Sequence, residues 1–180
     1  MPSDCLPRDR PLLTTDRLEL WLPKVGDTPQ VHAIVNEPET ARHLGPPQDY
    51  AEAFSRGLRA AGSWLLYGYG MFMLRKAGEE EIIGLAGIFH TYRGLGEGMD
   101  DQPEAGWIVG AGHVGRGYAR EAMVAALEWF DRTHGPKRVV AMIEVGNDAS
   151  FALAERLGFA EFRRTEKDGC ELVLLERVPD

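Results

Sequence analysis

The segment from Glu104 to Ala122 constrains the fold more than any other part of the chain. It reads EAGWIVGAGHVGRGYAREA, so a strand-like run ends in a turn dense in glycine and continues directly into a helical run. Glycines permit positive φ and lack the Cβ atoms that would keep a ligand away from the backbone. The first turn of a helix leaves N–H groups without partners, and the macrodipole adds partial positive charge there. The segment therefore predicts a strand–loop–helix unit that binds phosphate or pyrophosphate, with Arg116 and Arg120 at its rim.

The rest of the chain predicts a mixed sheet around this unit. We expect strands at Arg17–Leu22, Tyr69–Arg75, Glu81–His90, Glu104–Val109, Val139–Val145, Phe162–Glu166 and Glu171–Arg177. We expect four helices. The first runs from Asp27 to about Asn36, with a further turn at Glu39–Leu44; the second follows the N-cap Asp49 and has apolar positions at Ala53, Phe54, Leu58 and Ala61. The third is Gly117–Thr133, and the fourth runs from the N-cap Asp148 to Leu157. This order indicates an α/β or α+β fold, mostly antiparallel in its first half. The crossover from Glu104–Val109 to Val139–Val145 requires one parallel pair.

Composition indicates one globular domain without a membrane span. The 180 residues, 44% of them hydrophobic, show no internal linker, and we expect an ordered core over about residues 13–177 after a loose leader, Met1–Pro11. The most apolar stretch, Ala60–Leu74, is too short for a membrane span and contains three glycines.

Charge and cysteine content limit the binding partners and the cellular compartment that we expect for this chain. The net charge of −8 argues against a nucleic-acid-binding protein, which needs a basic surface to meet phosphates. Two cysteines at opposite ends of the chain, Cys5 and Cys170, do not form a disulfide framework, so we expect a reducing, cytoplasmic compartment. No metal-ligand spacing is found among the histidines and cysteines, so we expect no metal.

Two interpretations of the glycine-rich turn compete at this point with a plain structural turn. Gly110–Gly115 satisfies the dinucleotide pattern G-x-G-x-x-G after a strand and before a helix. However, the match begins only at residue 110, and a single strand–helix–strand unit follows it. The acidic residue expected about 20 residues further on is also missing. The other interpretation takes Gly115–Ala122 as the ligand loop.

The second interpretation rests on three segments that resemble the GNAT superfamily of acyl-CoA N-acyltransferases. In the loop, Gly117 and Ala119 match the last glycine positions of the pattern Gln/Arg-x-x-Gly-x-Gly/Ala, and Val114 replaces its first residue. Asn147–Phe159 resembles the Asn-x-x-Ser…Lys-x-Gly-Phe segment of the branch that contains ribosomal-protein N-acetyltransferases, with arginine at 156 in place of lysine. Leu13–Leu18 is similar to the first strand of that branch. The resemblance covers about Leu13 to Arg177.

The resemblance implies a GNAT-like sheet of about seven strands, flanked by four to five helices, with a central parallel pair that splays apart to hold CoA. It implies transfer of an acetyl group from acetyl-CoA to a primary amine, by direct attack in a ternary complex. Backbone groups around Ile108–Gly110 are expected to pair with the pantetheine amides, and a backbone N–H near Val109 is expected to polarise the thioester carbonyl. The expected cofactor contacts are Ile108, Val109, Gly110, Gly115, Arg116, Gly117, Tyr118, Ala119, Arg120, Asn147 and Arg156.

The resemblance also names candidate catalytic residues. Glu104 matches the general base, but it lies roughly 13 Å from Ile108 in an extended strand, so a water relay is needed. Glu144 is the reserve candidate. The position of the family's tyrosine acid is Ala154, which leaves Ser150 as the group near the departing thiolate. The bland alternatives stay open: Asn147 as a helix cap, Ser150 as an ordinary first-turn serine, and the whole fold as a non-catalytic acyl-CoA-binding module.

The residues leave several acceptor amines open: a protein N-terminus, an aminoglycoside, a polyamine or another small metabolite. They also leave open the length of the acyl group and the oligomeric state, monomer or homodimer. The N-terminal helices and the loop Tyr92–Gln102 are expected to shape the acceptor pocket.

Overall fold

The computed structural model describes residues 7–96 and 98–179. Cys5 and the first part of the predicted leader lie outside the described residues. From Leu12 onward the chain is already tied to the fold, because the N–H of Leu12 donates to the carbonyl of Leu20 at 3.0 Å.

Eight strands form one sheet in the order β1-β2-β3-β4-β5-β6-β8-β7. Their bounds are β1 Leu13–Thr14, β2 Leu18–Trp21, β3 Met71–Lys76, β4 Ile82–Thr91, β5 Gln102–Val109, β6 Val139–Glu144, β7 Ala160–Lys167 and β8 Cys170–Arg177. Every neighbouring pair is antiparallel except β5 and β6. The predicted mixed, mostly antiparallel sheet with one parallel pair is therefore confirmed. The eighth strand is the two-residue β1, which the sequence pattern did not separate from β2.

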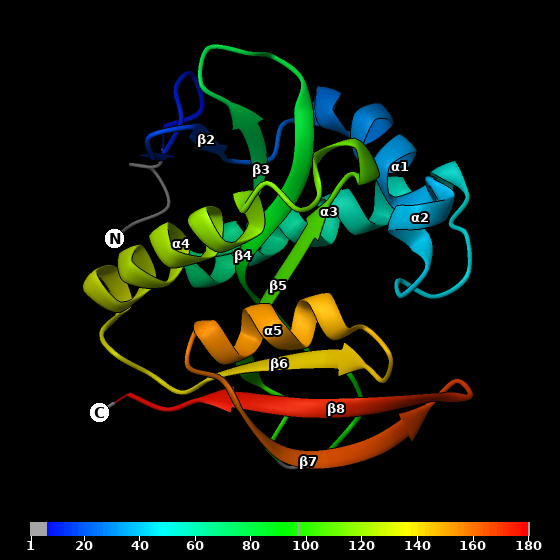
Figure 1. Ribbon diagram of the computed structural model, residues 1–180. Coiled ribbons are helices and arrows are strands. Elements are labelled where there is room, and N and C mark those ends of the chain that lie inside the picture. The colour runs from blue at the N-terminus through cyan, green and yellow to red at the C-terminus, as the bar shows by residue number, and fades with distance from the viewer. Residues whose placement is uncertain (1–6, 97, 180) are drawn as a thin grey trace.

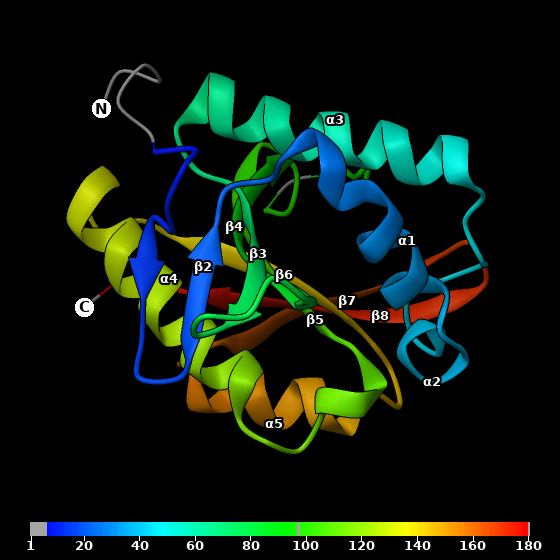
Figure 2. The same cartoon turned by 90° about the horizontal axis from the view of Figure 1, so that it is seen from above.

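Five α-helices cover the two faces of this sheet. They are α1 Thr28–Asn36, α2 Pro38–Ala41, α3 Tyr50–Tyr67, α4 Tyr118–His134 and α5 Asp148–Arg156, with short 3-10 turns at Val25–Asp27 (η2) and Ala111–His113 (η3). Helices α4 and α5 lie on one face, and α1, α2 and α3 lie on the other (Figures 1 and 2). This number of helices agrees with the prediction.

The main core lies between the sheet and α4. The helical stripe predicted for α4 is confirmed, since Met123, Ala126, Leu127 and Phe130 are buried there. Apolar strand residues such as Leu20 and Phe72 pack against the same cluster. Together they fix the start of α4 at the end of β5.

Helix α3 differs from the sequence expectation. It extends to Tyr67 and ends at Gly68, whose φ of 76° suits glycine at a helix C-terminus. Ala53 and Trp64 face the core, whereas Phe54 and Leu58 are about half exposed. The apolar positions recur at helical spacing, but that spacing does not reveal which stripe meets the sheet. Within the described residues, no helix is both long and apolar enough to cross a bilayer.

Candidate active site

The parallel strands β5 and β6 separate almost at once. Their register contains a single pair, Glu104 with Val140, although both strands continue beyond it. On its other edge β5 pairs with β4 along its full length. The edge of β5 that faces β6 is therefore open beyond Glu104, and we call this opening the gap.

The hydrogen-bond alternation of β5 decides which amides face the gap. Gly110 donates its N–H to the carbonyl of Ile83, toward β4, at 3.0 Å. Because neighbouring residues of an antiparallel strand direct their backbone groups to opposite edges, the groups of Ile108 also point toward β4, and those of Trp107 and Val109 face the gap. The expected backbone N–H near Val109 is thus available. The N–H of Gly110, part of the predicted cofactor contact, is already used within the sheet.

The loop after β5 forms a backbone cradle, defined here as Gly110–Arg120. Gly115 and Gly117 have φ of 73° and 80°, a conformation that favours glycine. Gly117 is the N-cap of α4 and provides no side-chain cap, and the first helical bond runs from the N–H of Glu121 to its carbonyl at 3.1 Å. Among the described residues, no partner is found for the N–H groups of Ala119 and Arg120. The cradle therefore presents free amides and the positive end of the helix dipole.

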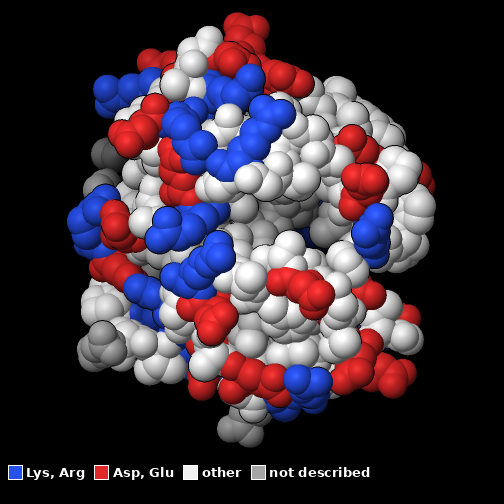
Figure 3. Space-filling model, viewed as in Figure 1, with Lys and Arg blue, Asp and Glu red and all other residues white. Residues whose placement is uncertain are grey.

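The space around the cradle is open. A Cβ atom added at Gly112 or Gly115 would have no heavy atom within 4 Å. The side chains of Arg116 and Arg120 are exposed beside it. On this face the surface is hollowed between the start of α4 and α5, and basic side chains gather to the left of the hollow, over α4 and toward β2 (Figure 3). An anionic group fits this arrangement.

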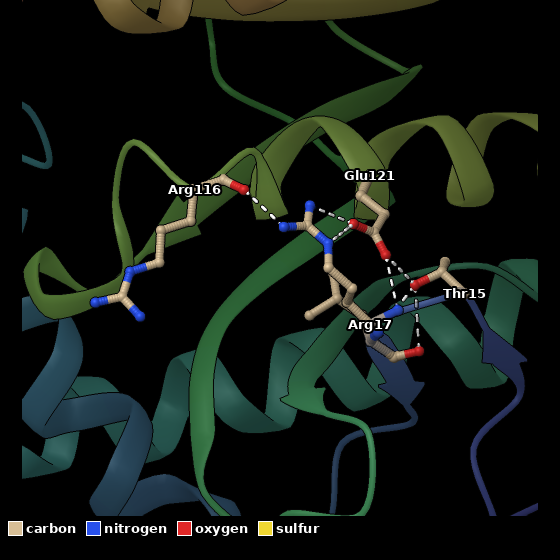
Figure 4. Close-up of polar contacts among 5 residues, drawn as sticks. Thr15, Arg17, Arg116 and Glu121 are labelled. Atoms are coloured by element: carbon tan, nitrogen blue, oxygen red, sulfur yellow. Dashed lines mark hydrogen bonds and ion pairs between the residues drawn. The ribbon is translucent and has the colours of Figure 1, made fainter.

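A cluster of polar contacts fixes the cradle to the N-terminal strands. Glu121 on α4 accepts hydrogen bonds from the Thr15 hydroxyl at 2.6 Å and from Nε of Arg17 at 2.7 Å (Figure 4). The guanidinium of Arg17 also donates to the carbonyl of Arg116 at 2.9 Å and lies 4.8 Å from the centre of the Tyr118 ring. Burial raises the pKa of Glu121, but the bonds from Thr15 and Arg17 outweigh it, so the pKa is lowered overall. We call these contacts the clasp.

The start of α5 lies on the same face of the sheet as α4. Asn147, rather than the predicted Asp148, is the N-cap, and its side-chain oxygen accepts from the N–H of Ser150 at 3.2 Å. Trp107 on β5 donates its indole N–H to the hydroxyl of Ser150 at 3.2 Å. Arg156 is exposed in the last turn of α5, so it lies at the opposite end of this helix from Asn147. Ala154, at the position of the family tyrosine, is buried.

Glu104 lies at the point where the gap begins. It is 4% exposed, and its two oxygens accept hydrogen bonds from Nε and a terminal nitrogen of Arg93, at 2.9 and 2.7 Å. The turn that carries Arg93 is fixed by Asp100, which accepts from the backbone N–H of Arg93 at 2.9 Å and of Gly96 at 2.7 Å. The loop after β4 therefore supplies the partner of Glu104.

The reserve carboxylate, Glu144, is the last residue of β6. Its side chain is 27% exposed, and one oxygen lies 3.5 Å from Nδ1 of His43. Cys170 on β8 is also close, because the charge of Glu144 is the largest cause of the raised pKa of this thiol, followed by burial and a hydrogen bond to Glu144. Glu144 is thus more accessible than Glu104.

Two candidate catalytic residues, Ser150 and Glu104, lie on opposite faces of the sheet at β5. Trp107 reaches Ser150 of α5, and Ala105 belongs to the same core as α4 and α5. Because side chains alternate along a strand, Glu104 and Ile108 point to the face covered by α1 and α3, where Ile108 packs beside Val35. The gap therefore lies between the face of the sheet that carries Ser150 and the face to which Glu104 points.

Three residues at this site were not predicted: Arg93, His43 and Trp107. Arg93 and His43 lie in loops without periodicity, and each meets its carboxylate only through the tertiary fold. Trp107 lies within the predicted strand, where alternation could have placed it on the opposite face from Glu104. The dinucleotide interpretation is not supported, because a doubly wound fold needs several parallel strands and the described sheet has one parallel pair. Within the described residues, no group of three or more potential metal ligands occurs.

Comparison with known proteins agrees with this geometry. The family described as the acetyltransferase (GNAT) domain matches residues 17–160. A putative GNAT-family acetyltransferase from Bordetella pertussis is 38% identical, with a TM-score of 0.85, over 94% of this chain and 100% of that one. An acetyltransferase from Agrobacterium tumefaciens is 28% identical, with a TM-score of 0.80, over 93% of this chain and 94% of that one.

The ribosomal-protein branch shares the fold at lower identity. The ribosomal-protein-S5-alanine acetyltransferase from Vibrio fischeri is 18% identical, with a TM-score of 0.75, over 93% of this chain and 96% of that one. At this identity the comparison shows a shared fold.

Proposed function

Because this chain belongs to the GNAT acetyltransferase domain family, we propose that it transfers an acetyl group from acetyl-CoA to a primary amine, in a ternary complex. The observation that carries the proposal is the position of the gap. It opens between β5 and β6 beside an α4 start that has no side-chain cap. A phosphate-binding helix start next to a free strand edge suits a ligand that has both a pyrophosphate and an amide-containing arm.

The chain's backbone would bind most of this cosubstrate. The free amides of the cradle, with Arg116 and Arg120 nearby, would bind the pyrophosphate. The gap-facing backbone of Trp107 and Val109 would pair with the pantetheine arm. When bound, acetyl-CoA supplies the acetyl group as a thioester. The N–H of Val109 would then stabilise the negative charge that develops on the carbonyl oxygen.

The acceptor must lose a proton, because an alkylammonium group has a pKa of about 10.4 in water. Glu104 is the proposed acceptor of that proton, through a water molecule. Its oxygens already accept from Arg93, so the water would use the lone pairs that remain. Glu144 is the alternative, and its greater exposure and its neighbour His43 give a water molecule easier access.

The leaving sulfur would be stabilised by Ser150. Its oxygen accepts from Trp107, so the hydroxyl hydrogen is free to point toward the thiolate. A thiol has a pKa near 8.5, so the thiolate is a good leaving group and a weak acid suffices.

The test is a comparison of ligands followed by an assay of turnover. CoA at a hundredfold excess over its dissociation constant should stabilise the fold by about 2.7 kcal/mol, and NAD should change the melting temperature little. Release of CoA thiol from acetyl-CoA in the presence of an amine panel then separates an enzyme from a non-catalytic binding module. A larger shift with NAD than with CoA would contradict the proposal.

A further inference from the structure

A cavity of about 510 Å³ lies on the face of the sheet opposite α4 and α5, between the α2–α3 loop and the first half of α3. Its lining includes Leu44, Gln48, Asp49, Glu52, Arg56 and Arg59. None of these residues takes part in the proposed acetyl transfer. We call this space the arginine pocket, after Arg56 and Arg59.

The wall of the arginine pocket is fixed by hydrogen bonds to α1. Asn36 binds both backbone groups of Gln48: its oxygen accepts from the N–H at 2.9 Å, and its amide donates to the carbonyl at 3.0 Å. Nε2 of His32 lies 3.1 Å from the same carbonyl. A loop that contains Pro46 and Pro47 has little backbone freedom left. The pocket is therefore formed before any ligand enters.

Two arginines, Arg56 and Arg59, line the pocket. Among the described residues, the ion pairs include neither Arg56 nor Arg59. When the side-chain amide of Gln48 is turned so that its oxygen faces Arg56, this oxygen accepts hydrogen bonds from two guanidinium nitrogens, at 2.6 and 3.1 Å. The amide carries no charge, so it does not neutralise the arginine.

The two acidic residues of the lining, Asp49 and Glu52, also accept hydrogen bonds from the backbone at the start of α3. Asp49 and Glu52 form a reciprocal capping box at the start of α3: the Asp49 carboxylate accepts from the N–H of Glu52 at 2.8 Å, and the Glu52 carboxylate accepts from the N–H of Asp49 at 3.0 Å. The pKa of Arg56 is lowered by burial and then by the charges of Arg59 and Arg93, which outweigh the opposing charge of Glu52. At Arg56 the charges of Arg59 and Arg93 therefore have a larger effect than the charge of Glu52.

Residues next to the arginine pocket contact both candidate carboxylates of the gap, Glu104 and Glu144. Arg93, whose charge reaches Arg56, binds Glu104 at the beginning of the gap. On the other side, the loop that contains Leu44 places the preceding residue, His43, 3.5 Å from Glu144. A ligand in the pocket thus lies on the same face of the sheet as the two carboxylates, opposite Ser150 and the cradle.

We infer that the arginine pocket binds an anionic group of the acceptor, a carboxylate or a phosphate, and thereby directs the acceptor's amine into the gap. The inference deepens the proposed acetyl transfer and rests on it. It selects amines that also carry a negative charge, and it disfavours polyamines. Guanidinium groups suit both anions, because their N–H groups match the oxygens in bidentate fashion.

The first experiment measures acetylation of matched amines by the full chain. Phosphoethanolamine is compared with ethanolamine, β-alanine with its amide, and putrescine serves as the dicationic amine. At least one anionic amine should have a kcat/KM about tenfold or more above its neutral partner. The Arg56→Gln/Arg59→Gln double variant should remove that tenfold advantage through KM, since it removes both guanidinium groups that would bind the anion. A preference for the neutral partners or putrescine, or an unchanged preference in the double variant, would overturn the inference.

The second experiment does not require turnover. Inorganic phosphate and acetate are titrated into the protein saturated with CoA, so that the cradle is not free to bind them. Wild type should bind at least one of these anions about tenfold or more tightly than the double variant. Arg132→Gln, which removes an exposed charge at the other end of α4, should bind like wild type. Phosphate binding without acetate binding would identify a phosphorylated acceptor, and the reverse a carboxylate.

The two experiments separate this inference from the function it rests on. Absence of CoA binding would contradict the acetyltransferase proposal, whatever the anions do. Normal CoA binding together with equal or absent anion binding in wild type and the double variant would overturn only the arginine pocket. Equal melting temperatures of wild type and the double variant establish that a lost anion site is not a lost fold.

Discussion

Trp107 on β5 donates its indole N–H to the hydroxyl oxygen of Ser150 on α5, at 3.2 Å, and so joins the open edge of the sheet to the start of the helix. The bond orients the hydroxyl of Ser150. Ser150 is either an ordinary serine of the helix or a catalytic residue, and these two roles predict different effects on the reaction. An ordinary serine has no reason to affect the departure of a thiolate. A catalytic one does, and its orientation then matters.

Ser150→Ala should therefore lower kcat by about tenfold, a modest effect because the thiolate leaves readily without help. The loss should depend only weakly on pH, since the serine hydroxyl does not titrate in the working range. Trp107→Phe is the matched control, because it keeps the hydroxyl and removes the bond that orients it. We expect a smaller loss in this variant. An unchanged kcat in Ser150→Ala would mean that Ser150 is an ordinary first-turn serine of α5 without a role in catalysis.

Gly117→Val should lower both CoA affinity and stability. The residue has a φ of 80°, which a β-branched side chain adopts only with strain of about 1–3 kcal/mol, and its side chain would enter the space beside the free amides of α4. Gly112→Ala is the control, since Gly112 lacks this strained backbone and a Cβ there meets no atom within 4 Å. Isothermal titration with CoA and thermal unfolding measure the two effects. A Gly117→Val variant that binds CoA as tightly as wild type would place the cradle elsewhere.

The role of Glu104 can be separated from its ion pair. If Glu104 accepts the proton of the amine, Glu104→Gln should lower kcat/KM by about 10²–10⁴-fold at neutral pH, with CoA affinity nearly unchanged. Part of the loss should be recovered at high pH, where free amine is available in solution. Arg93→Gln breaks the same ion pair but keeps the carboxylate. It should retain much more activity than Glu104→Gln.

Equal losses in those two variants would mean that the ion pair is structural. Arg93→Gln leaves the buried carboxylate of Glu104 without its charged partner, whereas Glu104→Gln leaves Arg93, whose side chain is one-third exposed, closer to water. Melting temperatures of both variants measure the loss of stability directly. In that case Glu144→Gln should show the pH-dependent loss instead, and the greater exposure of Glu144 would explain why.

The sequence predicted the layers of the fold well, because they depend on local patterns. Alternation and apolar runs located seven of the strands. The glycine-rich run predicted a helix from Gly117, one residue before the observed start of α4 at Tyr118. The two-residue strand β1 is too short for any periodic signal. The exposed Phe54 of α3 also escaped prediction, since helical spacing does not show which stripe is buried.

The contacts of the site were less predictable, for a physical reason. Glu104 and Asn147 were proposed from the family resemblance, and their hydrogen-bond partners in the structure are not all local. The N–H of Ser150 lies within the same helix turn as Asn147, whereas Arg93 reaches Glu104 through a loop of irregular backbone. Such a contact depends on the path of the whole loop, and no residue pattern encodes that path in isolation.

The last prediction concerns the clasp, which fixes the cradle through Glu121. The pKa of this carboxylate is lowered from 4.5 by the bonds from Thr15 and Arg17, in spite of its partial burial. A carboxylate with a lowered folded-state pKa stabilises the fold above its unfolded pKa, and this stabilisation disappears as the pH falls through the folded-state value. Wild type should therefore exceed Glu121→Gln in melting temperature at pH 7, and the difference should shrink once the pH falls below about 4.5.

The same contacts should affect the cofactor. Arg17 donates to the carbonyl of Arg116 inside the cradle, so Arg17→Gln should weaken CoA binding several-fold at neutral pH without changing kcat at saturating acetyl-CoA. Arg132→Gln, which removes a charge far from the clasp, controls for net charge. If the difference in melting temperature between wild type and Glu121→Gln stays constant from pH 7 to pH 3, the negative charge of Glu121 does not stabilise the fold. The clasp would then act only through packing, with the ring of Tyr118 under the Arg17 guanidinium as the contact to test next.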